Sequence, residues 1–123
     1  MEFREKQAIY MQIADYFRSN ILMEKWLPEE KVPSIRQLAV ELEVNPNTVM
    51  RTYTYLQETD IIYNKRGIGY FVSADAKNII IIIMKKKFIE DELPLIFRNM
   101  NMLDISINEI EKLFADWKKN KSK

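Results

Sequence analysis

Three polar residues near the middle of the chain are spaced so that they would share one face of a helix. Asn47, Arg51 and Thr54 stand at positions i, i+4 and i+7, which lie on the same side of a helix. Asparagine pairs with adenine, arginine with guanine or a phosphate, and threonine with a phosphate or a thymine methyl group. This face therefore has the chemistry to contact double-stranded DNA; the alternative is an ordinary solvated helix face. Thr48 and Met50 flank it as weaker candidates, and Asn45 is expected to cap the helix with a phosphate contact as a second role.

A second group of candidates lies in residues 61–72, which alternate apolar and polar side chains around the sequence NKRG. This pattern predicts a β-hairpin. Lys65 and Arg66 at its tip suit contact with phosphate or with the minor groove, and a solvated hairpin tip is the alternative. Gly67 permits a positive φ or a close approach to a phosphate backbone. The other basic run, Lys85–Lys87, is better explained as a solvated helix face.

Two helices are expected to position the polar face. Ser34 stands three residues before Gln37, the arrangement of a capping box, and it predicts a helix that ends near Leu42. Asn45 as N-cap and Pro46 in the first turn predict a second helix to about Glu58. Its inward side is expected to carry Val49, Tyr53 and Leu56. Two helices at this spacing, with the second polar at its exposed start, form a helix-turn-helix.

An amphipathic helix over residues 7–25 supports this pair. Ile9, Ile13, Phe17 and Ile21 recur every four residues and form an apolar stripe. The expected polar face of that helix carries Glu5, Lys6, Asp15 and Arg18. Between Pro28 and Pro33 a brief extended segment is expected. The fold class is therefore mainly α with a small β-hairpin: a winged helix-turn-helix domain over residues 1–73, followed by a helical segment over residues 74–123.

The last fifty residues are predicted to form helices that pair with a second copy of the chain. The run Ile79–Ile83 would suit a strand or a helix, and its flanking residues favour a helix to about Asp91. Pro94 should break or kink that helix, and a second capping box, Ser106–Glu109, should start the last one. Two helices cannot bury so many Met and aromatic side chains alone, so residues 74–123 are expected to form a homodimer.

Composition excludes several classes of protein. The chain has 123 residues with no His and no Cys, which removes the usual zinc ligands and the Cys–His and Ser–His catalytic pairs. We therefore expect no enzyme activity, no metal and no cofactor. The longest apolar run has six residues, against the roughly 20 of a membrane span, and no secretory signal is visible. A cytoplasmic protein without membrane contact is expected. The net charge of +1 gives no support to nucleic-acid binding, so that interpretation depends on where individual charges lie.

The order of motifs is similar to that of the winged-helix domain of the GntR family of bacterial transcription regulators. The matching segments are I-Y-x-Q-I in the first helix, P-S-x-R-x-L-A in the second, N-P-N-T-V in the third and G-x-G-x-F-V in the hairpin. The N-P-N-T-V variant and the tail most resemble the YtrA subfamily. The resemblance implies a contact of Arg36 with DNA backbone or base, with a surface arginine as the alternative. It also implies a dimerising tail and, in many members, genes beside those of ABC transporters.

Three turns depart from the family pattern. Glu43 stands in the helix-turn-helix turn where the family often has glycine, Glu29 replaces a usual glycine after Pro28, and Thr59-Asp60 replaces a usual Glu-Gly. Each change loses a residue that tolerates left-handed φ, at some cost in local stability and without loss of the fold.

The sequence thus predicts a homodimeric DNA-binding transcriptional regulator, a repressor in which each protomer recognises half of an inverted-repeat operator. A small-molecule effector is unknown. The alternative is a winged-helix module that binds another protein and never contacts DNA.

Overall fold

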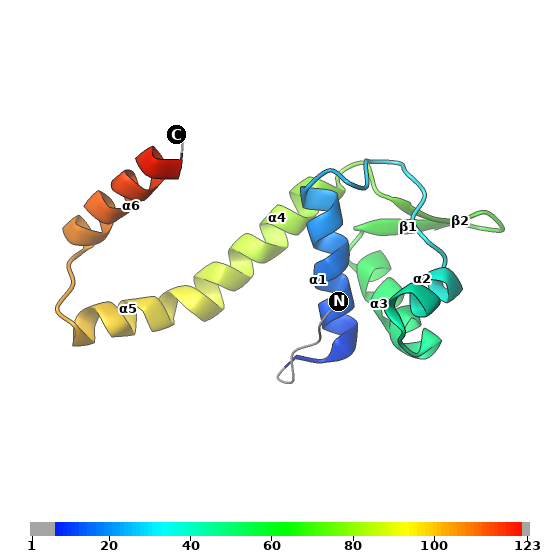
Figure 1. Ribbon diagram of the computed structural model, residues 1–123, viewed down its shortest axis with the longest axis horizontal. Helices are drawn as coiled ribbons and strands as arrows, with labels where there is room; N and C mark the ends of the chain where they lie inside the picture. Colours follow the sequence, from blue (N-terminus) through cyan, green and yellow to red (C-terminus); the bar gives the residue numbers. More distant parts are fainter. Residues whose placement is uncertain (1–6, 122–123) are drawn as a thin grey trace. The chain divides into compact units, whose positions relative to one another are not determined.

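The computed structural model describes residues 7–121, and its contacts form two compact units (Figure 1). The first unit extends to Ile83 and the second begins at Met84. The division lies within α4 (Ala76–Lys87), because Ala76 and Ile80 belong to the core of the first unit. The two units are described separately below.

The first unit contains the expected three helices and hairpin. In chain order these are α1 (Ile9–Leu22), α2 (Ile35–Leu42), α3 (Pro46–Glu58), β1 (Ile62–Lys65) and β2 (Gly69–Val72), followed by the start of α4. Both predicted helix starts are confirmed. Ser34 and Gln37 form a reciprocal capping box on α2, and the Asn45 side chain accepts a hydrogen bond from the Asn47 N–H at the start of α3.

The core of this unit is a set of aliphatic and aromatic side chains from every element. The Tyr53 ring links three of them: it meets Phe17 of α1 edge-on at 5.2 Å and Tyr70 of β2 at 4.9 Å between ring centroids. The Tyr53 hydroxyl donates a 2.5 Å hydrogen bond to the Pro33 carbonyl. The expected inward side of α3 is confirmed, since Val49, Tyr53 and Leu56 are fully buried.

The polar face predicted for α1 is wrong at Arg18, whose residue is only 7% exposed. Its guanidinium donates to Asp15 Oδ1 at 2.7 Å and to the Tyr55 hydroxyl of α3 at 2.8 Å. A long side chain can bury its stem while its charged end finds partners, which periodicity alone does not anticipate. Ile9, expected in the apolar stripe, is 45% exposed. Glu5 and Lys6 lie outside the described residues.

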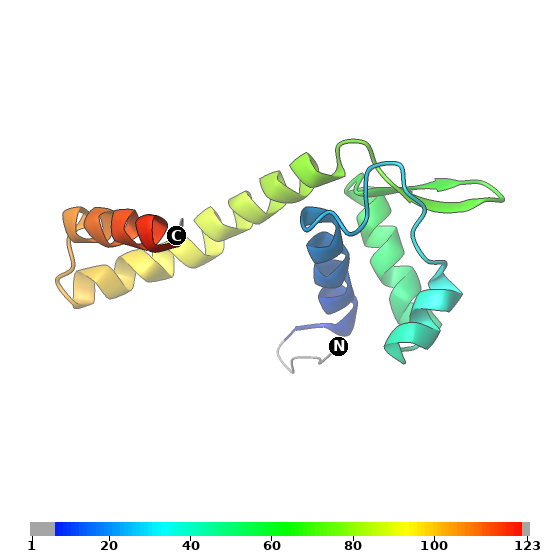
Figure 2. The ribbon, with the colours of Figure 1, turned by 45° about the horizontal axis from the view of Figure 1, so that its top comes forward.

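The hairpin of β1 and β2, called the wing below, is antiparallel and in register from Ile62↔Val72 to Lys65↔Gly69. Its turn lies at residues 66–68, so Lys65 ends a strand instead of lying in the turn. The extended segment between Pro28 and Pro33 is confirmed, because Lys31 forms an isolated bridge with Phe71. In both views the wing extends to the side of the unit that carries α2 (Figures 1 and 2).

The three turns that depart from the family pattern do adopt left-handed backbone. Glu29 has φ 68°, Glu43 has φ 56° and Asp60 has φ 61°. Glu43 is the C-cap of α2, where its N–H bonds back to helix carbonyls. Non-glycine residues in this region are strained by about 1–2 kcal/mol, so each of these turns costs stability.

The run Ile79–Ile83, which ends the first unit, is helical as predicted. The second unit is also helical: α4 passes into a π-helical turn, η1 (Phe88–Glu92), and then α5 (Leu93–Met102). Pro94 lies in the first turn of α5. Because proline lacks an N–H and clashes with the carbonyl of the preceding turn, the change in helical geometry falls just before it. After a short turn, α6 (Ile107–Lys121) follows (Figure 2).

The helices α5 and α6 bury little. Met100 is the buried residue of α5, and α6 has none. The exposed apolar residues of these helices include Leu95, Phe97, Ile107, Ile110, Leu113, Phe114 and Trp117. Within residues 7–121, no helix combines the length and the apolar character that crossing a membrane would need.

Candidate nucleic-acid interface

The helix α3 presents one buried and one exposed face. Asn47, Arg51 and Thr54 are all exposed, on the side opposite the core residues Val49 and Tyr53. The Thr54 hydroxyl donates to the Met50 carbonyl at 3.0 Å, so its methyl group and its oxygen lone pairs are what it can offer to a ligand. The geometry is that of a helix with one polar side available to the major groove.

The side-chain oxygen of Asn45 caps the N-terminus of α3. Asn45 Oδ1 accepts the Asn47 N–H at 2.8 Å, which leaves its amide N–H groups as donors for a phosphate. Thr48 is partly exposed, and its carbonyl lies 3.2 Å from the hydroxyl of buried Thr52. Both residues therefore support the helix start as well as bordering its exposed face.

The first turns of α3 border a small groove of about 300 Å³ against the start of α1. Arg51 lies on its wall with its guanidinium carbon 3.8 Å from the centroid of the Tyr10 ring. Asn47 and Thr48 line the same groove. Three of the predicted site residues are thus brought together, next to an aromatic side chain that the sequence did not indicate.

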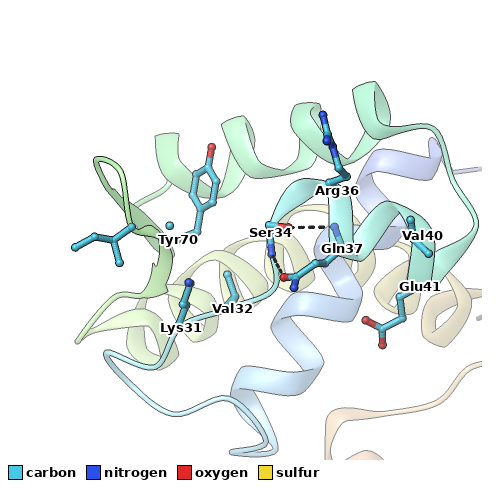
Figure 3. A pocket seen from close by; sticks show the side chains of 10 residues that line it. Lys31, Val32, Ser34, Arg36, Gln37, Val40, Glu41 and Tyr70 are labelled. Atoms are coloured by element: carbon cyan, nitrogen blue, oxygen red, sulfur yellow. Dashed lines mark hydrogen bonds between the residues drawn. The ribbon is translucent and has the colours of Figure 1, made fainter.

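A larger groove of about 600 Å³ separates α2 from the wing (Figure 3). Ser34, Arg36 and Gln37 border it from the first turn of α2, and Ile68 and Tyr70 border it from the wing. The dashed lines in Figure 3 mark the Ser34–Gln37 capping bonds of 2.9 and 3.1 Å. Both side chains are therefore structural, as expected.

Arg36 and Glu41 border this groove with opposite charges. Both residues are exposed, and their side chains point away from each other (Figure 3). The ion pairs described within residues 7–121 do not include Arg36, Arg51 or Arg66. In these ion pairs no carboxylate therefore competes with an anionic partner for the three guanidinium groups.

The end of the wing carries two cations, Lys65 and Arg66. Lys65 Nζ lies 4.8 Å from the centroid of the Phe71 ring, and Arg66 and Gly67 at the tip are exposed. Gly67 has φ 79° with open space where a Cβ would stand, so the turn requires glycine for its backbone and not for packing. At the base of the wing, Tyr63 donates to the Glu29 carboxylate, and this hydrogen bond raises the pKa of Tyr63.

Lys31 is a second candidate that sequence reasoning missed. A Cβ on Gly69 would stand only 2.9 Å from Lys31 Cε, so the lysine crosses the wing where glycine leaves room and reaches the groove beside α2. Its extended segment was predicted, and pairing of that segment with the hairpin would have placed it there. For Tyr10 no such signal exists, because nothing in the spacing of the first helix points to Arg51.

No group of three or more acidic side chains gathers to hold a metal ion in the described part of the chain. Seven of the nine predicted site residues occupy two grooves and one exposed tip, whereas Asn45 and Thr54 line neither groove. Arg36 lies at the groove beside the wing, Asn47, Thr48 and Arg51 lie at the groove beside α1, and Lys65, Arg66 and Gly67 lie at the end of the wing.

Comparison with known proteins places this unit in a family. The family model "Bacterial regulatory proteins, gntR family" matches residues 9–72. The HTH-type transcriptional repressor YtrA of Bacillus subtilis is 32% identical over 114 residues, which cover 89% of this chain and 82% of YtrA. Both findings agree with the expected GntR-type, YtrA-like sequence.

Solved structures are similar over comparable lengths. A GntR-family transcriptional regulator from Bacteroides thetaiotaomicron is 45% identical with a TM-score of 0.83, covering 93% of this chain and 99% of its own. The DNA-binding domain of AraR, solved in complex with operator ORR3, is 25% identical with a TM-score of 0.54, covering 59% of this chain and 88% of its own. The chain therefore belongs to the GntR family of bacterial transcriptional regulators and carries its winged-helix DNA-binding domain.

Proposed function

We propose that this regulator binds an inverted-repeat operator as a homodimer in the cytoplasm and represses the genes beside it. In this proposal α3 enters the major groove, with Asn47 and Arg51 at base edges, Thr54 at a thymine methyl group, and Asn45 and Thr48 at the flanking backbone. Arg36 contacts backbone or base from α2. Lys65, Arg66 and Gly67 approach the adjacent phosphates or minor groove from the wing.

One observation carries the proposal: the exposed face of α3 holds Asn47, Arg51 and Thr54 while its other face is fully buried. The likeness to the AraR domain, which is solved with its operator, supports the use of this face for DNA. The likeness to YtrA, described as a repressor, supports repression. Control of ABC-transporter genes is part of the proposal and is tested by the identity of neighbouring genes.

The homodimer is supported by α6, a fifteen-residue helix with no buried residue. An isolated helix of that length is marginal in water, and most helices gain stability by burying an apolar face. Ile107, Ile110, Leu113, Phe114 and Trp117 form such a face and are all exposed in the single chain. A second copy would cover it through residues 74–123 and would set the distance between the two half-sites.

The test is selection of bound sequences from random DNA, followed by titration of the selected site over about 50–200 mM salt. We expect a palindromic site and an affinity that falls steeply with salt. In the Asn47→Ala variant, discrimination at one base pair should fall by about 1–3 kcal/mol, while Asn78→Ala on exposed α4 should change nothing. Retention of full discrimination by Asn47→Ala would contradict the contact assignment.

The alternative, a winged-helix module that binds another protein, has one observation in its favour. Val40, Met50 and Ile68, on α2, α3 and the wing, are each more than half exposed, and exposed apolar side chains can mark a protein interface. Failure of the selection to enrich any sequence, together with binding that does not respond to salt, would favour this alternative.

A further inference from the structure

The Tyr10 ring lies against Arg51, a long and flexible side chain on the exposed face of α3. The guanidinium carbon of Arg51 is 3.8 Å from the Tyr10 ring centroid, within the range of a cation–π contact. The two residues come from different helices, α1 and α3. A long arginine on an exposed helix face would otherwise sample many rotamers.

The backbone of Tyr10 is itself hydrogen-bonded to α3. The Thr52 hydroxyl, which is fully buried, donates to the Tyr10 carbonyl at 2.8 Å. Thr52 directly follows Arg51 in the chain. This hydrogen bond therefore anchors the backbone of Tyr10 to α3 at the residue next to Arg51.

The ring contact leaves the N–H donors of Arg51 available for hydrogen bonds to DNA. A ring beneath the guanidinium occupies one face of its plane, whereas the N–H donors lie within the plane and point outward. Arg51 also takes part in none of the ion pairs described within residues 7–121. Asn47 borders the same groove, so the stack fixes the arginine next to the other base-contacting candidate.

We propose that Tyr10 is a positioning residue that holds Arg51 in the orientation for bidentate hydrogen bonding to a guanine and thereby sets specificity at one base pair. The ring orders the Arg51 side chain already in the protein without DNA, and so reduces the conformational entropy that Arg51 loses on binding. This inference rests on the proposed function and names a residue outside the expected set of DNA contacts.

The free protein provides the first measurement. Protons of the Arg51 side chain above an aromatic ring should resonate upfield in NMR spectra of the full chain, and the Tyr10→Leu variant should return them to ordinary positions. Tyr10→Phe should keep the shift because it keeps the ring. Ordinary Arg51 shifts in the unaltered chain would overturn the inference without any variant or DNA.

A double-mutant cycle on the selected operator provides the second measurement. We expect Tyr10→Leu to weaken operator binding about three- to tenfold, with the loss confined to sites that carry the base pair at which Arg51→Ala loses discrimination. Tyr10→Phe should bind as the unaltered chain does. In the Arg51→Ala background, Tyr10→Leu should have no further effect.

Two results would overturn the inference while leaving DNA binding intact. If Tyr10→Phe loses as much affinity as Tyr10→Leu, the hydroxyl contacts DNA directly and the ring is not the active part. If the losses of Tyr10→Leu and Arg51→Ala simply multiply, the two residues act independently. Absence of sequence-selective binding by the unaltered chain would instead overturn the proposed function, and the inference with it.

Discussion

At the scale of single residues, two of the interface candidates are cations that lie against aromatic rings. Arg51 lies on Tyr10 and Lys65 on Phe71. A carboxylate partner would also fix such a side chain, but it would cancel the charge that a phosphate or guanine needs. The net charge of +1 therefore says little about the charge that these individual side chains offer to a phosphate or a guanine.

The wing tip offers a test of backbone contact. Arg66→Ala should weaken binding to the operator and to unrelated DNA by similar factors, because a phosphate contact carries no sequence information. The slope of log affinity against log salt should decrease by about 1. Fluorescence anisotropy at several salt concentrations measures both quantities. Lys87→Ala, which removes a lysine from the solvated face of α4, is the matched control and should leave the slope unchanged.

Tyr53 joins the core to the segment before α2. Burial raises the pKa of Tyr53 above the ordinary value of 10.0, so the folded state favours the neutral phenol. Its contribution to stability is then full below pH 10.0 and is lost as the pH rises above that value, where the unfolded tyrosine ionises first. Urea unfolding of the unaltered chain should show this loss.

Tyr53→Phe should lower the free energy of unfolding by about 1–2 kcal/mol at neutral pH, because the Pro33 carbonyl loses its donor. It should also reduce the loss of stability above pH 10.0. An unchanged alkaline profile in Tyr53→Phe would show that another group controls it.

At the scale of elements, the turn between α2 and α3 contains backbone strain that a glycine at the same position would avoid. Glu43 has φ 56° at the C-terminus of α2, a position where glycine is preferred. The α2 helix has only eight residues, so the conformation of this cap affects a large share of it. The orientation of α3 relative to α2 depends on this turn.

Glu43→Gly should therefore raise the free energy of unfolding. Relief of about 1–2 kcal/mol of left-handed strain is offset in part by the greater freedom of glycine in the unfolded chain, and we expect a net gain of about 0.5–1 kcal/mol. Thermal and urea unfolding measure it. Glu43→Gln removes the charge and keeps the strained backbone, so a gain of the same size in that variant would assign the effect to electrostatics.

At the scale of the whole molecule, the second unit leaves many apolar side chains exposed that the single chain does not bury. The helices α5 and α6 expose Leu95, Phe97, Leu113, Phe114 and Trp117, each half exposed or more. The first unit has a continuous core of its own. The proposed homodimer would make the stability of the second unit depend on protein concentration, so the two units should respond differently to dilution.

Leu113→Glu should raise the dimer dissociation constant at least about tenfold, because a buried carboxylate without a partner is costly. Sedimentation measurements over a range of concentrations test this. Affinity for a palindromic operator should fall in parallel, while unfolding of the winged unit should not change. Asn108→Glu adds the same charge beside Glu111, Lys112 and Ala115 on the polar side of α6 and should leave the dimer intact. Equal weakening by both variants would place the interface elsewhere.

The helix-turn-helix and the wing could be predicted from the sequence because their signals are local. Capping at Ser34 and Asn45, the buried period of Val49, Tyr53 and Leu56, and the glycines of the hairpin each act within a few residues. The same locality made the helical prediction for Ile79–Ile83 correct, since its flanks outweighed the β-branched run. The left-handed turns at Glu29, Glu43 and Asp60 followed from comparison with glycine positions in the family pattern.

Contacts between side chains of different elements could not be predicted from the sequence, because they depend on how the elements pack. The burial of Arg18 against Tyr55, the crossing of Lys31 over Gly69 and the stack of Arg51 on Tyr10 join residues that are distant in the chain. Periodicity assigns a residue to a face, but it does not say what a long side chain reaches from that face. The candidate DNA contacts were therefore predictable from local pattern, whereas the groups that orient them depend on how the helices pack.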